Sequence, residues 1–325
     1  MPIDINQVLL SILVVSCNSE LLNKMLASIA KATRIDPSEV EILCSWNGEA
    51  SNENQIINNS GYEFLISQRV SYHFAKNMNS LAEKASGDIL LMINDDIILD
   101  NNSIDEALKC LDSKSNFGII GANLRDSNNR IAHSGMLFDS KNSPYHKLES
   151  LVLSKSDTRH DLSELVPCVT GALILLLRTN FLSLKFNENY KVCGEDVELC
   201  LDIREKLNLK VVLCPQFSAI HMVSKTRKEK GQYGNTSEDV VLMRQRRRKF
   251  IENAKQTDLI DELNANRKES EDLNQLIRSL LNEHEYANLE VKKEIDYWKK
   301  QAHSLHLTRI QQSEEIERLT KSLRS

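Results

Sequence analysis

The nine residues from Asp88 to Asp96, DILLMINDD, decide the fold of this chain. The part Asp88–Ile93 is apolar from its second residue onward, without the alternation of a half-exposed strand, and so predicts a strand buried on both faces. Asn94, Asp95 and Asp96 follow at once, so the strand carries polar groups to the edge of a sheet. Because ligands of parallel sheets bind at the carboxyl ends of the strands, we expect chemistry at this edge.

Predicted strands and helices alternate on both sides of this stretch. Apolar residues recur at helical spacing over Glu20–Lys31, Asn77–Ala85 and Val197–Leu207, between apolar runs of strand length. The alternation predicts an α/β fold with a mainly parallel, Rossmann-like sheet that helices cover on both faces. Lys141–Asp161 is a polar loop. The other predicted strands are Val8–Val15, Val40–Cys44, Tyr62–Ile66, Gly118–Leu124, Ile131–Phe138, Val169–Arg178 and two short edge elements, Val211–Cys214 and Ala219–His221.

Composition and chain breakers divide the chain into two parts. Of its 325 residues, 41% are hydrophobic and 27% charged, which excludes wholesale disorder and collagen-like repeats. All ten glycines and all five prolines lie at or before Gly234, and the 91 residues after it contain neither. A stretch this long and rich in Glu, Lys, Leu, Asn and Gln indicates extended helix. We therefore predict a globular domain over residues 1–251 and a long helical tail over residues 252–325.

The tail allows a heptad pattern of coiled-coil type. Its seam runs from Leu259 to Val291 in one frame and from Ile295 to Leu323 in a second, and several seam positions are polar. As one uninterrupted helix, the last 67 residues would span about 100 Å, which is too long for one domain to cover. We therefore expect a coiled coil that makes the protein a homo-oligomer through residues 259–323. The alternative is a long amphipathic helix that folds back on its own domain.

Charge, cysteines and hydropathy narrow the class of protein. The net charge of −5, with neither half strongly basic, argues against a nucleic-acid-binding protein. The seven cysteines are scattered without a Cys-x-x-Cys pair, as is typical of reduced thiols in a cytosolic protein. The longest apolar run, Ala172–Leu177, is too short to cross a bilayer, and we interpret the N-terminal run as a strand rather than a signal peptide. We expect a cytoplasmic protein, with the inner face of the cytoplasmic membrane as the alternative.

Three sets of polar residues are candidates for chemistry. The adjacent carboxylates Asp95 and Asp96 repel each other unless a cation or a basic group is near, and Mg²⁺ prefers such oxygen ligands. An Asx turn or a helix cap is the alternative for this pair. Glu195 and Asp196 precede a predicted helix, where they can cap its N-terminus or supply a general base. His221 ends a short strand and is either a metal ligand or a structural histidine.

The order of these motifs resembles the inverting family 2 glycosyltransferases of the GT-A fold, over roughly residues 8–251. The opening LSILVVSCNSELLNKMLASI is similar to the first strand and helix of that family. The most specific block is SYHFAKNMNSLAEKASGDILLMINDD, in which Asn79 lies fifteen residues before Asn94, the start of the family's acidic motif. A third block, VTGALILLLRTNFLSLKFNENYKVCGEDVELCLDIRE, resembles the acceptor side.

The resemblance implies roles for these residues. It makes Asp96 and His221 ligands of a Mn²⁺ or Mg²⁺ ion, and Asp196 the general base, with Glu195 beside it. It implies a UDP- or dTDP-linked sugar as donor. Trp46 has packing at a strand end as its alternative role. The implied donor-binding residues are Ser16, Asn18, Trp46, Asn47, Asn79, Asn94, Asp95, Lys225 and Arg227.

Two histidines and a basic run bear on the acceptor. His133 and His146 frame the polar loop, and similar segments occur in family members that build bacterial polysaccharides, which implies a place in the acceptor pocket; an ordinary structural role is the alternative. A glycan or lipid-linked acceptor in cell-surface polysaccharide or O-antigen assembly is implied. The basic run Arg244–Lys249 has three interpretations: it lines the active site, forms salt bridges to the tail, or makes peripheral contact with anionic lipid headgroups.

Two other functions fit parts of the pattern. A sugar-phosphate nucleotidyltransferase shares the α/β start and the acidic site, but the turn Ser16–Ser19 lacks the glycine-rich phosphate loop that such enzymes need. A degenerate scaffold that acts through its coiled coil is the other alternative, because Asn94 and Asn187 stand where the family commonly has acids. The transferase hypothesis requires that Asp96, His221 and Asp196 converge on one cleft.

Overall fold

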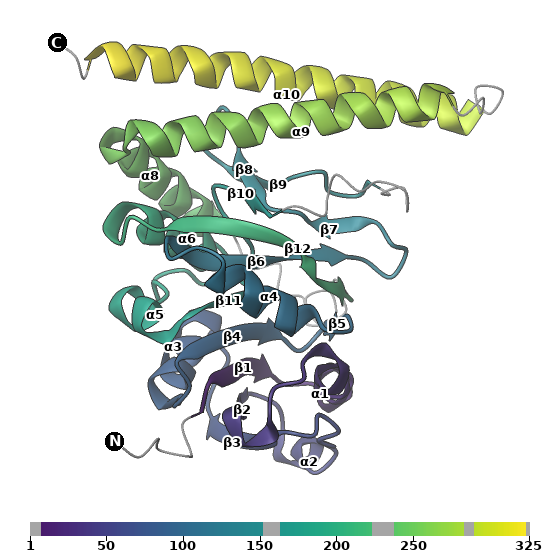
Figure 1. Ribbon diagram of the computed structural model, residues 1–325, viewed down its shortest axis with the longest axis vertical. Coiled ribbons are helices and arrows are strands. Elements are labelled where there is room, and N and C mark those ends of the chain that lie inside the picture. Colours follow the sequence, from purple (N-terminus) through teal and green to yellow (C-terminus); the bar gives the residue numbers. More distant parts are fainter. Residues whose placement is uncertain (1–7, 152–162, 223–236, 283–288, 323–325) are drawn as a thin grey trace.

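The structure is a computed structural model that describes residues 8–151, 163–222, 237–282 and 289–322 (Figure 1). A ten-stranded mixed sheet forms its centre, in the order β10-β12-β6-β11-β4-β1-β2-β3, with β5 paired to β12 and β7 paired to β6. The strands are β1 (Leu10–Ser16), β2 (Val40–Trp46), β3 (Glu63–Arg69), β4 (Ile89–Asn94), β5 (Ile97–Leu99), β6 (Phe117–Arg125), β7 (Ile131–His133), β10 (Glu164–Leu165), β11 (Leu173–Leu177) and β12 (Lys210–His221).

The N-terminal half of the sheet is parallel, as predicted. Strand β1 pairs in parallel with β2 and β4, and β2 pairs in parallel with β3. Val14 of β1 lies opposite Ile93 of β4, and Ser16 lies opposite Trp46 of β2. The carboxyl ends of these strands therefore meet at one edge of the sheet.

Two strand predictions need correction. The two short edge elements form the single strand β12, which pairs in parallel with β6 and antiparallel with β5 and β10. Its register shifts between Cys214 and Ser218, around Pro215, which explains the interrupted sequence pattern. The strand predicted over Ile131–Phe138 is also divided, because Gly135 adopts a φ of +90° between β7 and the next strand. That strand, β8 (Met136–Phe138), pairs antiparallel with β9 (Pro144–His146) in a separate hairpin.

Helices cover both faces of the sheet, as predicted for a doubly covered α/β fold. One core cluster joins α1 (Ser19–Ala32) and α4 (Ser103–Asp112) to the strands, and the helix α1 is capped by Asn18. A second cluster, on the other face, includes α3, α5 and α6. The bounds of these helices are Phe74–Lys84 for α3, Arg178–Leu184 for α5 and Glu195–Lys206 for α6; the short α2 spans Ala50–Glu53 and a 3₁₀ turn spans Pro37–Glu39.

The C-terminal region consists of α8 (Ser237–Asn253), α9 (Gln256–Asn282) and α10 (Leu289–Ser322). Helices α9 and α10 lie side by side above the sheet (Figure 1), so the tail is not one uninterrupted helix. Leu273 and Ile277 of α9 share a buried cluster with Trp298 of α10 and with Leu148 of the domain. In the described residues the tail therefore packs on its own domain, as the alternative expected, but as two helices rather than one long helix, and Leu273, Ile277 and Trp298 of the heptad seam are buried within one chain. Association between chains stays a prediction.

The basic run forms ion pairs on two sides. Arg246 pairs with Asp202 and Glu205 of α6. Arg247 donates to Glu262 of α9, with its Nη1 at 2.9 Å from Oε1, and both side chains are buried. Of the three interpretations of the run, the salt bridge to the tail is thus present. No helix in the described ranges is long and apolar enough to span a membrane.

Candidate active site

The acidic turn after β4 lies beside the end of β12. Asp95 and Asp96 occupy the turn between β4 and β5, and β5 pairs antiparallel with β12 so that Ile97 lies opposite His221. This pairing brings Nε2 of His221 to 3.3 Å from Oδ1 of Asp96. The backbone N–H of Met222 also donates to the carbonyl oxygen of Asp96 at 2.9 Å. Two residues 125 positions apart in the sequence are therefore neighbours at the rim of the sheet.

The chemistry of this pair fits a divalent cation. Oδ1 of Asp96 is buried and makes no hydrogen bond within the described part of the chain, apart from its 3.3 Å contact with His221. A carboxylate oxygen that faces an imidazole nitrogen is a donor set that Mn²⁺ accepts. No group of three or more His, Cys, Asp or Glu side chains in the described residues could hold a metal. Oxygens of a bound phosphate or of water would therefore complete the coordination.

Asp95 points to the neighbouring strand. Its Oδ2 accepts a 2.7 Å hydrogen bond from the hydroxyl of Ser16, and its side chain is buried. Because Ser16 is the last residue of β1, this bond ties the acidic turn to the adjacent parallel strand. The two acids thus have different partners: Asp95 bonds Ser16 and Asp96 faces His221.

Asp196 lies in the first turn of α6, and two backbone N–H groups bind its carboxylate. Its Oδ2 accepts from the N–H of Gly171, and its Oδ1 accepts from the N–H of Val197, both at 2.8 Å. A Cβ atom at Gly171 would lie 3.2 Å from that of Asp196, so the carboxylate packs directly on this backbone. The next residue, Ala172, accepts a hydrogen bond from the N–H of Asn94. Asp196 is therefore linked through this segment to the end of β4.

Two histidines on different strands form a buried pair. The Nδ1 atoms of His133 and His146 lie 2.8 Å apart. Nε2 of His133 faces the backbone N–H groups of Gly135 and Thr170, each at 3.3 Å, so this nitrogen is an acceptor. A neutral His133 therefore carries its proton on Nδ1 and donates to His146, which places the proton of a neutral His146 on Nε2. Burial, followed by the charges of His146, His221 and Lys147, holds the pKa of His133 well below its usual value.

The histidine pair lies within electrostatic reach of the other candidates. Burial lowers the pKa of His146; Glu149 and Asp196 oppose this shift, and His221 adds to it. The contacts of the segment Thr170–Ala172 give the geometry: the N–H of Thr170 faces Nε2 of His133, the N–H of Gly171 donates to Asp196, and the carbonyl of Ala172 accepts from the N–H of Asn94. Three consecutive residues therefore connect His133 and the predicted base Asp196 to the end of β4, two residues before Asp96.

Trp46 does not present a ring face to this edge. Its side chain is 2% exposed, belongs to the core, and donates from Nε1 to the carbonyl of Glu49 at 3.3 Å. A buried ring cannot stack on the base of a nucleotide. In this structure Trp46 therefore has the packing role, and donor binding by this residue stays a prediction.

Asn79 also has a structural role. It is buried; its Oδ1 accepts from the N–H of Phe186, and its Nδ2 donates to the carbonyl of Phe186, both at 2.9 Å. Nδ2 also donates to Glu188 at 3.0 Å. These hydrogen bonds of the amide all go to the loop before α6, so Asn79 ties α3 to that loop; the implied donor contact stays a prediction.

The remaining donor-side candidates differ in what they offer. Asn18 uses its Oδ1 to cap α1. Asn47 donates from Nδ2 to the carbonyl of Val70, and its buried Oδ1 has no hydrogen-bond partner in the described ranges. Asn94 is half-buried at the end of β4. Lys225 and Arg227 lie outside the described residues.

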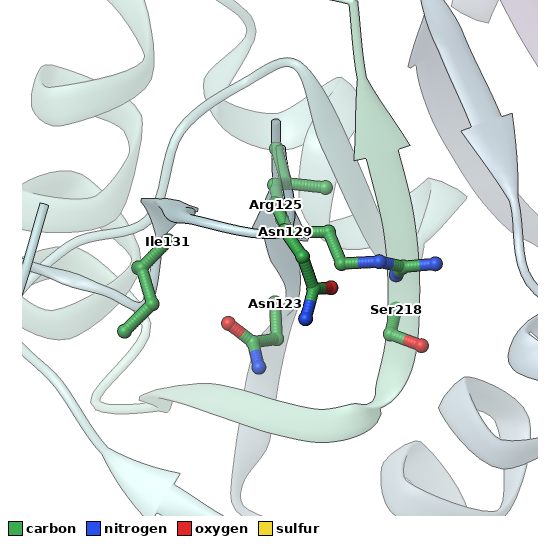
Figure 2. A pocket seen from close by; sticks show the side chains of 6 residues that line it. Asn123, Arg125, Asn129, Ile131 and Ser218 are labelled. Carbon is green, nitrogen blue, oxygen red and sulfur yellow. The ribbon is translucent and has the colours of Figure 1, made fainter. Parts of the chain in front are cut away.

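A polar hollow lies beside the carboxyl end of β6 (Figure 2). Asn123 and Arg125 of β6 line it together with Ser218 of β12. The guanidinium of Arg125 is neutralised, because it donates two hydrogen bonds of 2.5 and 2.7 Å to Asp100. None of the predicted catalytic or metal-binding residues lines this hollow.

Sequence reasoning missed the residues that hold the polar loop. Lys147 is fully buried and forms an ion pair with Glu164, although its position in a polar stretch suggested exposure. Glu269 of α9 is buried and contacts the same loop. No local pattern marks either residue, because each partner is distant in the sequence.

Comparison with known proteins adds a distant sequence relative. No protein-family profile matches the chain. The O-antigen biosynthesis protein RfbC of Myxococcus xanthus is 30% identical over 155 residues, which cover 46% of this chain and 12% of that relative. The chain therefore matches only about an eighth of the length of this curated protein.

Solved structures share the fold. A mannosyltransferase, PcManGT from Pyrobaculum calidifontis in complex with GDP-Man and Mn²⁺, superposes with a TM-score of 0.55 at 12% identity, over 94% of this chain and 86% of that one. TarS residues 1–349 from S. aureus, in complex with UDP, gives 0.50 at 16% identity, over 97% and 91%. GalNAc-T7 with UDP, GalNAc and Mn²⁺ gives 0.51 at 14% identity, over 67% and 44%. The chain has the GT-A fold of glycosyltransferases.

Proposed function

We propose that this chain is a metal-dependent, inverting glycosyltransferase that moves a sugar from a nucleoside diphosphate sugar to an acceptor hydroxyl. The observation that carries the proposal is the geometry at the end of β4, where Asp96 faces His221 and the segment Thr170–Ala172 joins His133 and Asp196 to Asn94. The solved structures with the same fold include complexes with nucleotides and Mn²⁺, which supports this class of donor.

Asp96 and His221 are the proposed ligands of a Mn²⁺ or Mg²⁺ ion. The buried, unpartnered Oδ1 of Asp96 and Nε2 of His221 are the two atoms that would hold it. A divalent ion bound there would supply Lewis-acid stabilisation of the departing diphosphate. Both side chains are less than one quarter exposed, so their interaction with a charged ligand is only partly screened by water.

The donor would bind along the ends of β1, β2 and β4. The free Oδ1 of Asn47 is an acceptor for an N–H of the nucleotide base, which suits a UDP- or dTDP-linked sugar. Ser16 and Asp95 hold the adjacent turn in shape through their hydrogen bond. Asn94, at the mouth of β4, is the proposed contact to the sugar or diphosphate.

Asp196 is the proposed general base. It takes the proton of the acceptor hydroxyl, whose oxygen then attacks the anomeric carbon from the face opposite the diphosphate. The bond from this carbon to the diphosphate oxygen breaks with its electron pair, which inverts the configuration. The N–H groups of Gly171 and Val197 fix the orientation of the carboxylate, and Glu195 lies buried in the same turn.

The acceptor would bind at the histidine pair. With its Nδ1 engaged by His133, a neutral His146 offers the N–H at Nε2 to an acceptor oxygen. The name of the Myxococcus relative supports a glycan or lipid-linked acceptor of O-antigen or similar surface-polysaccharide assembly. We also propose a cytoplasmic location, a division into a transferase domain over 1–251 and a helical tail over 252–325, and self-association through that tail.

A donor panel tests this function. UDP-, dTDP- and GDP-linked sugars are incubated with the full chain and Mn²⁺ or Mg²⁺, with water as the acceptor of the sugar, and the nucleoside diphosphate released by this hydrolysis is measured with and without EDTA. We expect release from at least one donor, and we expect EDTA to abolish it. Binding of a donor without any release would instead favour the degenerate scaffold.

A further inference from the structure

The hairpin of β8 and β9 carries His146 and is attached to all three C-terminal helices. Arg244 of α8 donates from Nε to the hydroxyl of Ser143 at 2.8 Å. Gln312 of α10 donates from Nε2 to the carbonyl of Phe138. The third attachment comes from Glu269 of α9. Its partners, Tyr145 and Leu148, lie closer in sequence to His146 than the partners of the other two helices do.

The carboxylate of Glu269 holds the chain on both sides of His146. Its Oε2 accepts a 2.8 Å hydrogen bond from the hydroxyl of Tyr145, and its Oε1 accepts a 3.2 Å hydrogen bond from the backbone N–H of Leu148. Glu269 is 2% exposed, so water cannot replace these partners without opening the interface. One side chain therefore fixes the residue before His146 and a backbone group two residues after it.

A second contact from α9 holds Lys147, the residue between His146 and Leu148. Lys147 is fully buried and pairs with Glu164, and Glu164 also pairs with Lys268 of α9 at 2.5 Å. Consecutive residues of α9, Lys268 and Glu269, thus reach the segment that runs from Tyr145 to Leu148. Within that segment, His146 points to His133, with the two Nδ1 atoms 2.8 Å apart.

We propose that Glu269 is a positioning residue that keeps the His146 ring on His133 and thereby sets the geometry of the acceptor side. The effect on acceptor binding rests on the proposed transferase function, whereas the effect on the histidine pair does not. The C-terminal helices then serve the active site of their own chain, through the β8–β9 hairpin.

Histidine side-chain NMR tests the positioning step without any substrate. In ¹⁵N-histidine-labelled full chain, the pair should show a Nδ1-protonated His133 and a Nε2-protonated His146, assigned with His133→Gln and His146→Gln. We expect Glu269→Ala to convert the His146 signals to a mixture of tautomers. Glu269→Gln should resemble the wild type, since its amide oxygen can accept from Leu148 and its NH₂ group can donate to Tyr145.

Two further variants supply a control and an independent test of the same contact. Glu271→Ala removes an acid from an exposed site two residues along α9 and should leave the histidine signals unchanged. Tyr145→Phe removes only the hydroxyl donor and should shift the His146 signals in the same direction as Glu269→Ala, which preserves the test if Glu269→Ala does not fold. Wild-type signals in both folded variants, or an equal change in Glu271→Ala, would overturn the proposal.

Kinetics then separates positioning from the proposed function. With a donor found in the panel, Glu269→Ala should leave donor KM and acceptor-independent diphosphate release within about twofold of wild type. Transfer to acceptor should fall by about 10- to 100-fold, because a displacement of about 1 Å has effects of this size. If Glu269→Ala alters the histidine signals but the wild-type chain releases nucleoside diphosphate from no donor, the transferase function is overturned and the positioning role is retained. An unchanged transfer rate in the Glu269→Ala chain would overturn the acceptor-side effect.

Discussion

The donor side of the sheet and the β8–β9 hairpin are held in place by different kinds of contact. On the donor side, consecutive parallel strands bring Ser16, Asn47 and Asp95 to one edge through backbone register alone. The hairpin that carries His146 is held instead by side chains of α8, α9 and α10, which lie 100 or more positions later in the sequence. The first arrangement follows from strand order, whereas the second depends on single long-range contacts, so mutations should affect the two regions differently.

The largest expected effect concerns the chemistry that joins the two regions. Asp196→Asn keeps the size of the side chain but removes the proposed base, so turnover should fall about 10²- to 10⁴-fold. Thermal unfolding and donor binding should remain close to wild type. Asp296→Asn, at an exposed site on α10, is the matched control. Turnover of Asp196→Asn within a few-fold of wild type would assign the base to another residue.

The next largest effect should be a loss of stability when the buried ion network of Glu262, Arg204 and Arg247 is broken. Glu262 of α9 pairs with Arg204 at 2.7 Å and with Arg247, and all three side chains are buried. Glu262→Ala leaves two buried guanidinium groups without their partner, so the free energy of unfolding should fall by about 3–5 kcal/mol. Denaturant titration measures this change, with Glu271→Ala as the exposed control. Equal midpoints for the two variants would show that α9 is not anchored through this network.

Asn79 tests whether the donor side depends only on strand register. Because its amide bonds Phe186 and Glu188, Asn79→Ala should lower stability by about 1–3 kcal/mol and leave donor KM unchanged. Denaturant titration and steady-state kinetics give the two values on one preparation. A raised donor KM with unchanged stability would restore the donor-binding role that the family resemblance implied.

The smallest expected effect is a pH dependence at the α9 contact. Burial raises the pKa of Glu269 to about 7, while Tyr145, the N–H of Leu148 and Lys147 oppose the shift and Asp272 adds to it. Between the ordinary carboxyl pKa and about 7, the unfolded chain has lost this proton and the folded chain retains it, so the stability of the wild type falls as pH rises. Glu269→Gln lacks this dependence. The stability of the variant relative to wild type should therefore rise by about 1 kcal/mol from pH 5 to pH 6.

Thermal unfolding of both proteins at the two pH values measures this difference, because the titration of all other groups cancels in the comparison. A gap that is the same at pH 5 and pH 6 would mean that Glu269 is ionised over the whole range, with its charge balanced by Lys147.

The sequence predicted the parts of the site that follow from strand ends. The buried run before Asp95 and Asp96 indicated where the acids would lie, and the structure places His221 beside Asp96. Trp46 and Asn79 show the limit of such reasoning. A strand end or a motif spacing locates a residue along the chain, but burial and a partner 107 positions away decide what the side chain does.

The tail shows a related limit. Its heptad pattern indicated an apolar seam, and Leu273, Ile277 and Trp298 do lie in one, but the pattern does not specify which surface fills it. For these three residues, part of that surface is Ile131, Leu148 and Leu151 of the same chain. Glu269 and Lys147 left no signal at all, because buried charged residues are recognised only when their partners are known.

The central claim is that Asp96 and His221 bind the metal while Asp196 acts in the same cleft without binding it. Electron paramagnetic resonance titration of Mn²⁺ in the presence of UDP, and in parallel of GDP, tests this claim directly. We predict that Asp96→Asn and His221→Ala each weaken Mn²⁺ binding by about tenfold or more, whereas Asp196→Asn binds Mn²⁺ like wild type and fails only in turnover. Unchanged Mn²⁺ affinity in the first two variants, or its loss in the third, would contradict the account.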